Sequence, residues 1–194
     1  MNWKPIFLNG PRHYGQPVPL LMQAPQLPGV WRAFNNAEAA FQALKFWDQA
    51  NDFEPLSGPA AFFKYRSMQG HADFEYAGFG SNWKAMASVL EVKFAPGTLM
   101  AELLDLTGDA FLLEHNEIPG RDCIWSDNQQ GDGLNWLGLQ LMLLREQPRK
   151  SRFWSAWLLR HCDRQTGDVD EVWRNSVQRA AARLKGATGV RSGR

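Results

Sequence analysis

Four polar side chains recur at helical spacing within the otherwise apolar residues 34–50, FNNAEAAFQALKFWDQA: Glu38, Gln42, Lys45 and Gln49. Steps of four, three and four residues place them on one face of a helix, which Asn35 or Asn36 would cap. The other faces are apolar, which predicts a central helix. A buried carboxylate needs partners, so this polar row is typical of an internal network or a ligand pocket. Spacing alone equally allows a structural Glu–Lys pair bridged by glutamine, or a solvated row.

A second polar group lies in the long loop NEIPGRDCIWSDNQQGDG, residues 116–133. It contains Asp122, Trp125, Asp127 and Asn128, and its glycines let the backbone approach a ligand closely. Loops of this length are often functional. The alternative is a surface loop in which the Asp and Asn side chains only form Asx-turns.

The flanking segments predict the elements that position these residues. A short helix is expected from Pro59, and residues 71–81 form a glycine-broken loop. Core helices are predicted over residues 82–95, 98–108 and 135–147, the last with Leu137, Leu141 and Leu144 on one face. Residues 110–115 form either a short buried strand or a helical turn.

The two ends of the chain differ in composition. Six of the eleven prolines fall within residues 1–28, which predicts extended segments and short edge strands there. Residues 145–194 hold 12 Lys/Arg against 5 Asp/Glu, whereas residues 1–144 hold 9 against 15. This basic end, with Trp154, Trp157 and Trp173, suits phosphate contact. The alternative is an amphipathic helical pair with arginines outside and tryptophans inside.

Composition narrows the class of protein. A chain of 194 residues suits one domain with a core that needs no disulfide or metal. Its two cysteines form no CxxC motif or Cys/His cluster, so no metal site is expected and a reducing cytoplasm fits best. No signal-peptide pattern or membrane-length apolar run is present, so a soluble cytoplasmic protein is expected.

Six segments together carry a family resemblance: AEAAFQALKFW, NWKAM, VLEVKF, LLDLTGDAFLLE, RDCIW and GLNWLGLQLMLLR. In order and spacing they resemble the NADAR family, also called YbiA-like, over about residues 30–147. The resemblance implies a helix-rich α+β fold. It implies a NADAR domain over residues 1–147, divergent in its Pro-rich extended residues 1–29. The basic helical extension, residues 148–194, would pack on the same domain.

The resemblance also implies an N-glycosidase that cleaves a ribosyl C1–N bond without a cofactor. One family substrate class is ADP-ribose on a nucleobase, notably guanine in DNA, removed as an antitoxin or repair activity. The expected partners are then ADP-ribosylated nucleic acid, touched by the basic C-terminal region, and a cognate ADP-ribosyltransferase toxin. The alternatives are hydrolysis of riboflavin-pathway phosphoribosylamine intermediates, and a nucleotide-binding module without turnover.

Motif matches assign expected roles to single residues. Glu38 would stabilise the sugar cation or activate water, and Asp122 would be the second carboxylate or orient ribose hydroxyls. Lys45 would offset the charge of the leaving group or set the ionisation of Glu38. The substrate-binding residues expected from the motifs are Gln42, Trp83, Trp125 and Asn135, with the tryptophans stacking on a base. Arg66, in a segment that aligns poorly with the family, is a further expected ligand, for a phosphate.

Three departures from the family pattern bear on the substrate. Ala39 stands where the family commonly has His, and Ser126 stands where it commonly has Gly. The Ser-Asn-Phe segment typical of the family's N-terminus is not recognisable. These departures motivate the binding-module alternative.

Overall fold

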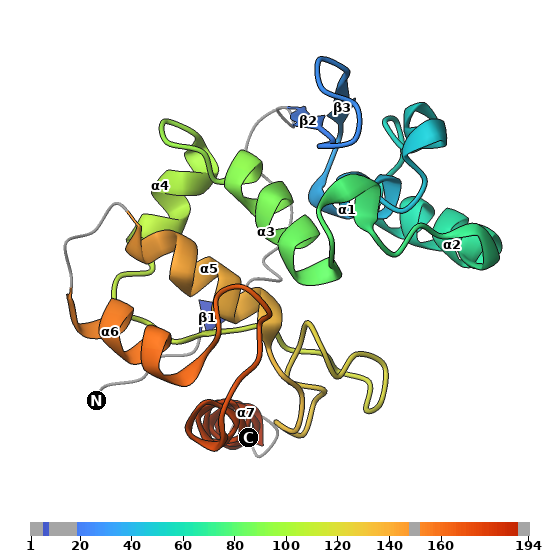
Figure 1. Cartoon of the computed structure of the whole chain (residues 1–194). Coiled ribbons are helices and arrows are strands. Elements are labelled where there is room, and N and C mark those ends of the chain that lie inside the picture. The colour runs from blue at the N-terminus through green and yellow to red at the C-terminus, as the bar shows by residue number, and fades with distance from the viewer. Residues whose placement is uncertain (1–5, 8–18, 148–151, 190–194) are drawn as a thin grey trace. The chain divides into compact units, whose positions relative to one another are not determined.

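The computed structural model describes residues 6–7, 19–147 and 152–189 (Figure 1). The chain forms two compact units, one of residues 13–101 and one that joins residues 1–12 to residues 102–194.

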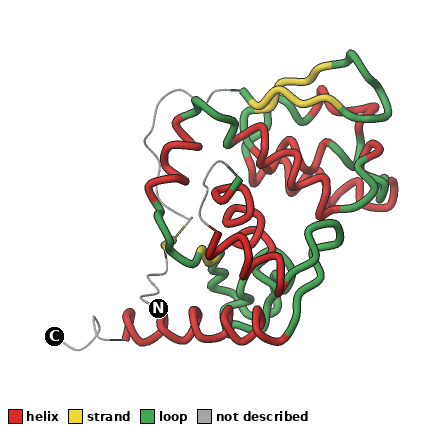
Figure 2. The backbone as a smooth tube through the Cα atoms, turned by 60° about the vertical axis from the view of Figure 1, so that its left-hand side comes forward, coloured by secondary structure: helices red, strands yellow, loops and turns green. Residues whose placement is uncertain are grey.

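The first unit begins with an antiparallel hairpin, drawn in yellow in Figure 2. Its strands are β2 (Leu20–Gln23) and β3 (Trp31–Phe34), with Leu20 paired to Phe34. Alternation along the strands buries Leu20, Met22 and Phe34 and exposes Leu21 and Trp31. The predicted short strands are therefore present in the described part of the Pro-rich segment. Its residues 1–5 and 8–18 lie outside the described part.

Helix α1 (Ala37–Ala43) is shorter than predicted. Asn36 caps it, since its Oδ1 accepts a hydrogen bond from the Ala39 N–H at 2.8 Å. The helix ends because Phe46 leaves the helical region, with φ −145° and ψ 50°, and a 3-10 helix follows at Trp47–Asp52. This break buries both Phe46 and Trp47, which one straight helix with apolar residues all round would not achieve. Gln49 is exposed beyond the break, so the expectation that it extends the row was wrong.

Two further helices pack on α1, as expected of a central helix. Helix α2 (Gly58–Met68) starts after the Ser57 cap, and α3 (Asn82–Lys93) starts after the Ser81 cap. Between them, 3-10 turns at Gln69–His71 and Tyr76–Gly78 interrupt the predicted loop. Both predicted helices are confirmed.

Helix α4 (Leu99–Leu106) leads to the second unit, where β4 (Leu112–Leu113) pairs in parallel with β1 (Ile6–Phe7). Of the two alternatives left for residues 110–115, the strand is therefore correct. Helix α5 (Trp136–Glu146) packs on β4.

The buried face of α5 differs from the predicted one. Leu139, Leu141 and Met142 are buried, whereas Leu137 and Leu144 are only half-buried. Gly138 sets this face, because a Cβ there would overlap the Leu112 carbonyl oxygen. The helix therefore approaches the strand along its glycine side rather than along its leucine row.

The C-terminal region forms α6 (Arg152–His161) and α7 (Glu171–Gly189). Trp173 is fully buried against Phe111, with ring centroids 5.2 Å apart, and its Nε1–H donates to the Leu134 carbonyl at 2.8 Å. The basic side chains of α7 are exposed: Arg174, Arg179, Arg183 and Lys185. The amphipathic alternative is thus confirmed for α7, and this helix is part of the second unit's core.

The helices outweigh the two small sheets, so the predicted helix-rich α+β class is confirmed. Within the described ranges, every helix is too short or too polar to cross a membrane.

Candidate functional site

The polar row, formed by Glu38 and Gln42 of α1 and by Lys45 just beyond its last residue, is a continuous chain of hydrogen bonds. Lys45 Nζ donates to Gln42 Oε1 at 2.7 Å, and Gln42 Nε2 donates to Glu38 Oε1 at 2.8 Å. An ammonium group only donates and a carboxylate only accepts, so the amide between them has one possible orientation. The row therefore holds the Glu38 carboxylate in a defined position.

Lys45 occupies an aromatic cage. Its Nζ lies 3.9 Å from the ring centroid of Tyr65, 4.7 Å from that of Phe41 and 5.9 Å from that of Tyr76. The ring faces attract the ammonium group. Burial lowers the pKa of Lys45 from 10.5 to about 8, although the charge of Glu38 opposes the shift. Lys45 therefore titrates near physiological pH.

A strained turn supplies one wall of the cage. Tyr76 and Ala77 have φ of 50° and 54°, a region that residues other than glycine rarely adopt. The Asp73 carboxylate holds the turn by accepting the N–H groups of Glu75 and Ala77, at 2.8 Å and 2.9 Å. The backbone N–H of Asp73 donates to the Lys45 carbonyl at 2.8 Å. Burial, followed by the nearby Tyr65 and Asp73, raises the pKa of Tyr76.

The two ends of the row differ in exposure. Lys45 and Gln42 are 6% and 4% exposed, whereas Glu38 is half-buried. In the described contacts, Glu38 uses one carboxylate oxygen, the one facing Gln42. The carboxylate end of the row is thus the part that a solute can reach. Sequence reasoning found the row but missed the cage, because Tyr65 and Tyr76 come from segments with no recognised motif.

Other expected residues of this unit have different surroundings. Trp83 is 2% exposed, so its ring has no open face on which a base can stack in this structure. Ala39 is fully buried, so the departure from the family histidine lies inside the core. Arg66 is exposed near the end of α2, the helix that packs beside α1. Only Arg66 of these three is positioned to meet a ligand.

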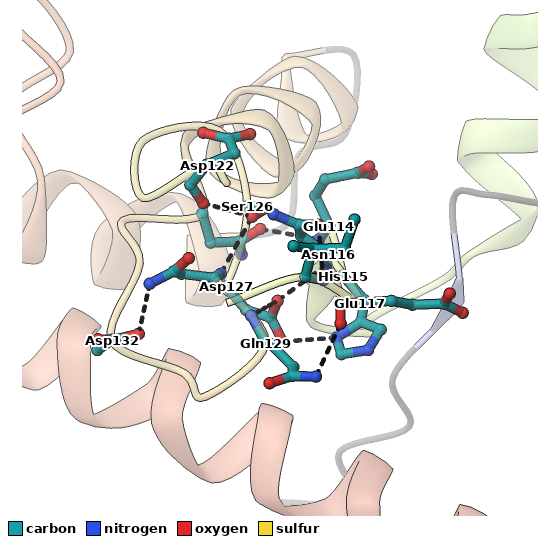
Figure 3. A network of polar contacts seen from close by, with 12 residues as sticks. Glu114, His115, Asn116, Glu117, Asp122, Ser126, Asp127, Gln129 and Asp132 are labelled. Atoms are coloured by element: carbon teal, nitrogen blue, oxygen red, sulfur yellow. Dashed lines mark hydrogen bonds and ion pairs between the residues drawn. The ribbon is translucent and has the colours of Figure 1, made fainter. Parts of the chain in front are cut away.

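The long loop of the second unit is organised around Asp127, which is fully buried (Figure 3). Its Oδ2 lies 2.8 Å from His115 Nδ1, and its Oδ1 accepts the N–H groups of Asn116 and Gln129 at 3.1 Å and 3.0 Å. Both carboxylate oxygens therefore hold the loop together. The sequence placed Asp127 in the loop but gave no signal for its pairing with His115.

Asp122 and Trp125 lie in the same loop. Asp122 Oδ1 accepts the N–H groups of Ile124 and Trp125 at 3.0 Å and 2.9 Å, which is the Asx-turn alternative. In Figure 3 its carboxylate points away from His115 and Asp127. The half-buried Trp125 ring packs edge-on against Trp136, with centroids 5.6 Å apart. The loop thus fixes both side chains by local contacts.

Asn135, an expected substrate ligand, is held by contacts with the backbone. It is fully buried, its Nδ2 donates to the Leu112 carbonyl at 2.9 Å, and its Oδ1 accepts the Glu114 N–H at 2.9 Å. Gly133 and Gly138 are needed because a Cβ on either would overlap neighbouring backbone. The Gly-x-Asn-x-Leu-Gly motif therefore locks α5 onto β4 and the loop.

The structure brings Glu38, Gln42 and Lys45 together, the first two on α1 and Lys45 in the turn that follows it, with Arg66 on the adjacent helix. The others, Asp122, Trp125 and Asn135, belong to the second unit. No group of three or more His, Cys, Asp or Glu side chains suited to a metal ion occurs in the described part of the chain.

Comparisons with known proteins agree on one family. The N-glycosidase YbiA of Escherichia coli K12 is 32% identical over 121 residues, which cover 60% of this chain and 71% of that protein. A riboflavin biosynthesis protein of Vibrio vulnificus is 29% identical over 113 residues, 58% of this chain but only 30% of that protein. No protein-family model matches the sequence.

The fold is also similar to a solved structure. The NMR structure of E. coli YbiA matches with a TM-score of 0.57 and 24% identity, over 84% of this chain and 92% of that one. The division into a family domain of residues 1–147 and a basic extension of residues 148–194 stays a prediction.

Proposed function

Because this chain belongs to the YbiA-like, or NADAR, family of N-glycosidases, we propose that it removes ADP-ribose from a modified nucleobase, with guanine in DNA as the first candidate. The family consists of hydrolases of N-glycosyl bonds, so the substrate carries a ribosyl group. The reaction adds water across the C1–N bond and yields free ADP-ribose and the base.

The observation that supports this proposal is the polar row of Glu38, Gln42 and Lys45, which begins on α1. Its carboxylate end is accessible and its lysine end is buried in aromatic rings. Departure of the base develops positive charge on C1 and the ring oxygen, which a fixed carboxylate stabilises. Glu38 performs this role and then takes a proton from the water that bonds to C1.

Lys45 acts through Gln42. Its Nζ contacts Gln42 and the cage, so of its two expected roles the geometry favours control of Glu38 over contact with the leaving group. The oriented amide fixes the rotamer of the Glu38 carboxylate. Lys45 and Gln42 are therefore positioning residues. Asp122 and Trp125 remain proposed substrate ligands on the family motif alone.

The partner we propose is ADP-ribosylated DNA, possessing a phosphate backbone that suits the exposed basic side chains of α7. A cognate ADP-ribosyltransferase toxin would be the source of this substrate. This assignment is supported by the charge of the helix and by the proposed reaction.

The test compares wild type with Glu38→Gln on an oligonucleotide that carries ADP-ribosylated guanine, with release of ADP-ribose followed by chromatography. We expect release by wild type and a loss of about 10²–10⁴-fold in the variant, with its melting temperature unchanged because Glu38 is half-buried. Glu91→Gln, which removes an exposed carboxylate on α3, is the matched control and should release ADP-ribose at the rate of wild type. Equal rates for wild type and Glu38→Gln would contradict the role of Glu38.

Two alternatives have specific support. Similarity to the riboflavin biosynthesis protein favours phosphoribosylamine intermediates as substrates, and these are the next compounds to test if wild type releases no ADP-ribose. The departures at Ala39 and Ser126 favour a binding module. Binding of ADP-ribose by wild type without turnover of either substrate class would support the module.

A further inference from the structure

Helix α2 presents large aromatic side chains to solvent. Phe62 is 40% exposed and Phe63 is 71% exposed, and their rings meet edge-on with centroids 6.3 Å apart. Ala61 is the one fully buried residue among those of α2. Phenylalanine is normally among the buried residues, so a pair of exposed rings is a candidate contact surface.

This pair is continuous with the polar row. The Phe62 ring lies 6.2 Å from that of Tyr65, and the Tyr65 ring lies 3.9 Å from Lys45 Nζ. At the other end of α2, a Cβ on Gly58 would be in ordinary contact with the Glu38 Cβ at 3.5 Å. Helix α2 therefore runs beside the row from Glu38 to Lys45, and the exposed rings flank the proposed site.

A cation completes the surface. Arg66 is exposed and lies three and four residues after Phe63 and Phe62, which makes the three side chains neighbours on the helix. Among the described ion pairs, Lys64 is paired with Asp52 at 3.1 Å, whereas Arg66 takes part in none. The surface thus combines two rings with one guanidinium group suited to phosphate.

We propose that Phe62, Phe63 and Arg66 form a subsite for the adenosine diphosphate end of the ADP-ribosyl group. The rings stack on the adenine and the guanidinium binds the diphosphate. This inference rests on the proposed function, which supplies a substrate with an adenine and two phosphates.

The charges around the surface favour one nucleotide over a nucleic-acid strand. A strand is normally held by several cations along its backbone. Here one guanidinium group stands beside a lysine that is already paired, and the neighbouring 3-10 helix contributes Asp48 and Asp52. A single base with its diphosphate matches two rings and one cation.

The experiment measures binding of ADP and of ribose 5-phosphate to the full chain by calorimetry. Stacking contributes about 1–3 kcal/mol per base, so Phe63→Ala should weaken ADP about tenfold, with Phe63→Trp restoring affinity. Arg66→Gln should weaken both compounds, whereas Phe63→Ala should leave ribose 5-phosphate unchanged. Trp31→Ala, which removes an exposed ring on β3, is the control and should bind like wild type.

The outcomes separate this inference from the proposed function. If wild type releases ADP-ribose from the substrate but Phe63→Ala and Arg66→Gln bind ADP as wild type does, the subsite is wrong and the function stands. If wild type releases no ADP-ribose but ADP binding depends on both residues, the subsite stands without the function. An equal loss in Phe63→Ala and Trp31→Ala would also reject the subsite.

Discussion

The polar row that begins on α1 and the loop around Asp127 are both networks of carboxylates and amides. They differ in how many protein donors hold the carboxylate and in how deeply it is buried. In the row, Glu38 is held from one side by a side-chain amide and is half-buried. In the loop, Asp127 is fully buried and both its oxygens accept protein donors. A carboxylate whose two oxygens both accept hydrogen bonds from the protein stabilises a loop. A carboxylate that is oriented by one protein donor and is otherwise accessible is suited to chemistry.

After Glu38→Gln, the largest expected effect concerns the polar row, in which we propose that Glu38 reacts. Lys45→Met removes the donor to Gln42, so the amide loses its fixed orientation and Glu38 its position. We expect kcat to fall about 10²-fold, because small displacements of a reacting group cost about that much, with KM little changed. Lys64→Met, which removes a surface lysine paired with Asp52, is the matched control. Normal kcat in Lys45→Met would show that the row is only structural.

The next effect concerns the second unit, where Asn135 holds α5 to β4. Asn135→Ala leaves the Leu112 carbonyl and the Glu114 N–H without their partner. Each unsatisfied buried group costs about 1–3 kcal/mol, so the free energy of unfolding should fall by about 2–4 kcal/mol. Denaturant titration measures this loss, with Asn175→Ala on the exposed side of α7 as control. If Asn135→Ala instead raises KM at full stability, Asn135 binds substrate after all.

The pH dependence of stability and of turnover tests whether the polar row needs the charge of Lys45. Since the pKa of Lys45 is about 8 in the folded chain and 10.5 ordinarily, the ammonium is lost first from the folded state as pH rises. Between these values the unfolded chain binds more protons, so the contribution of Lys45 to stability increases with pH. Turnover that needs the ammonium should fall through the same range.

Between these two pKa values, the free energy of unfolding should therefore rise while kcat falls. Unfolding titrations and kcat measured from pH 7 to pH 10 would detect them, and Lys45→Met should lack the increase in stability. A kcat that stays level to pH 10 would show that turnover does not need the charge of Lys45.

The smallest effect concerns the exposed arginines of α7. Arg179→Gln combined with Arg183→Gln should weaken binding of ADP-ribosylated DNA and reduce its salt dependence, by about 0.9 in the log–log slope per lost phosphate contact. Point substitutions are preferable to truncation, because Trp173 of the same helix lies in the core. An unchanged slope would remove α7 from the DNA contact.

Local pattern was sufficient for much of the fold. Trp83, Val89 and Leu90 at helical spacing predicted α3, which begins at Asn82 as expected and ends at Lys93, two residues before the predicted end. The length of α1 was not predictable in this way. Residues 34–50 all suit a helix, and only the need to bury Phe46 and Trp47 against other elements decides where the helix breaks.

The sequence by itself determined the family, the α+β class and the spacing of Glu38, Gln42 and Lys45, because these depend on residue order along the chain. Only the tertiary structure decided which of the expected residues are buried and which are accessible. Asn135 and Trp83 look like site residues in the sequence, yet each is buried by contacts with residues distant along the chain. The cage around Lys45 likewise needs Tyr65 and Tyr76 from separate segments, and burial among them is what lowers its pKa.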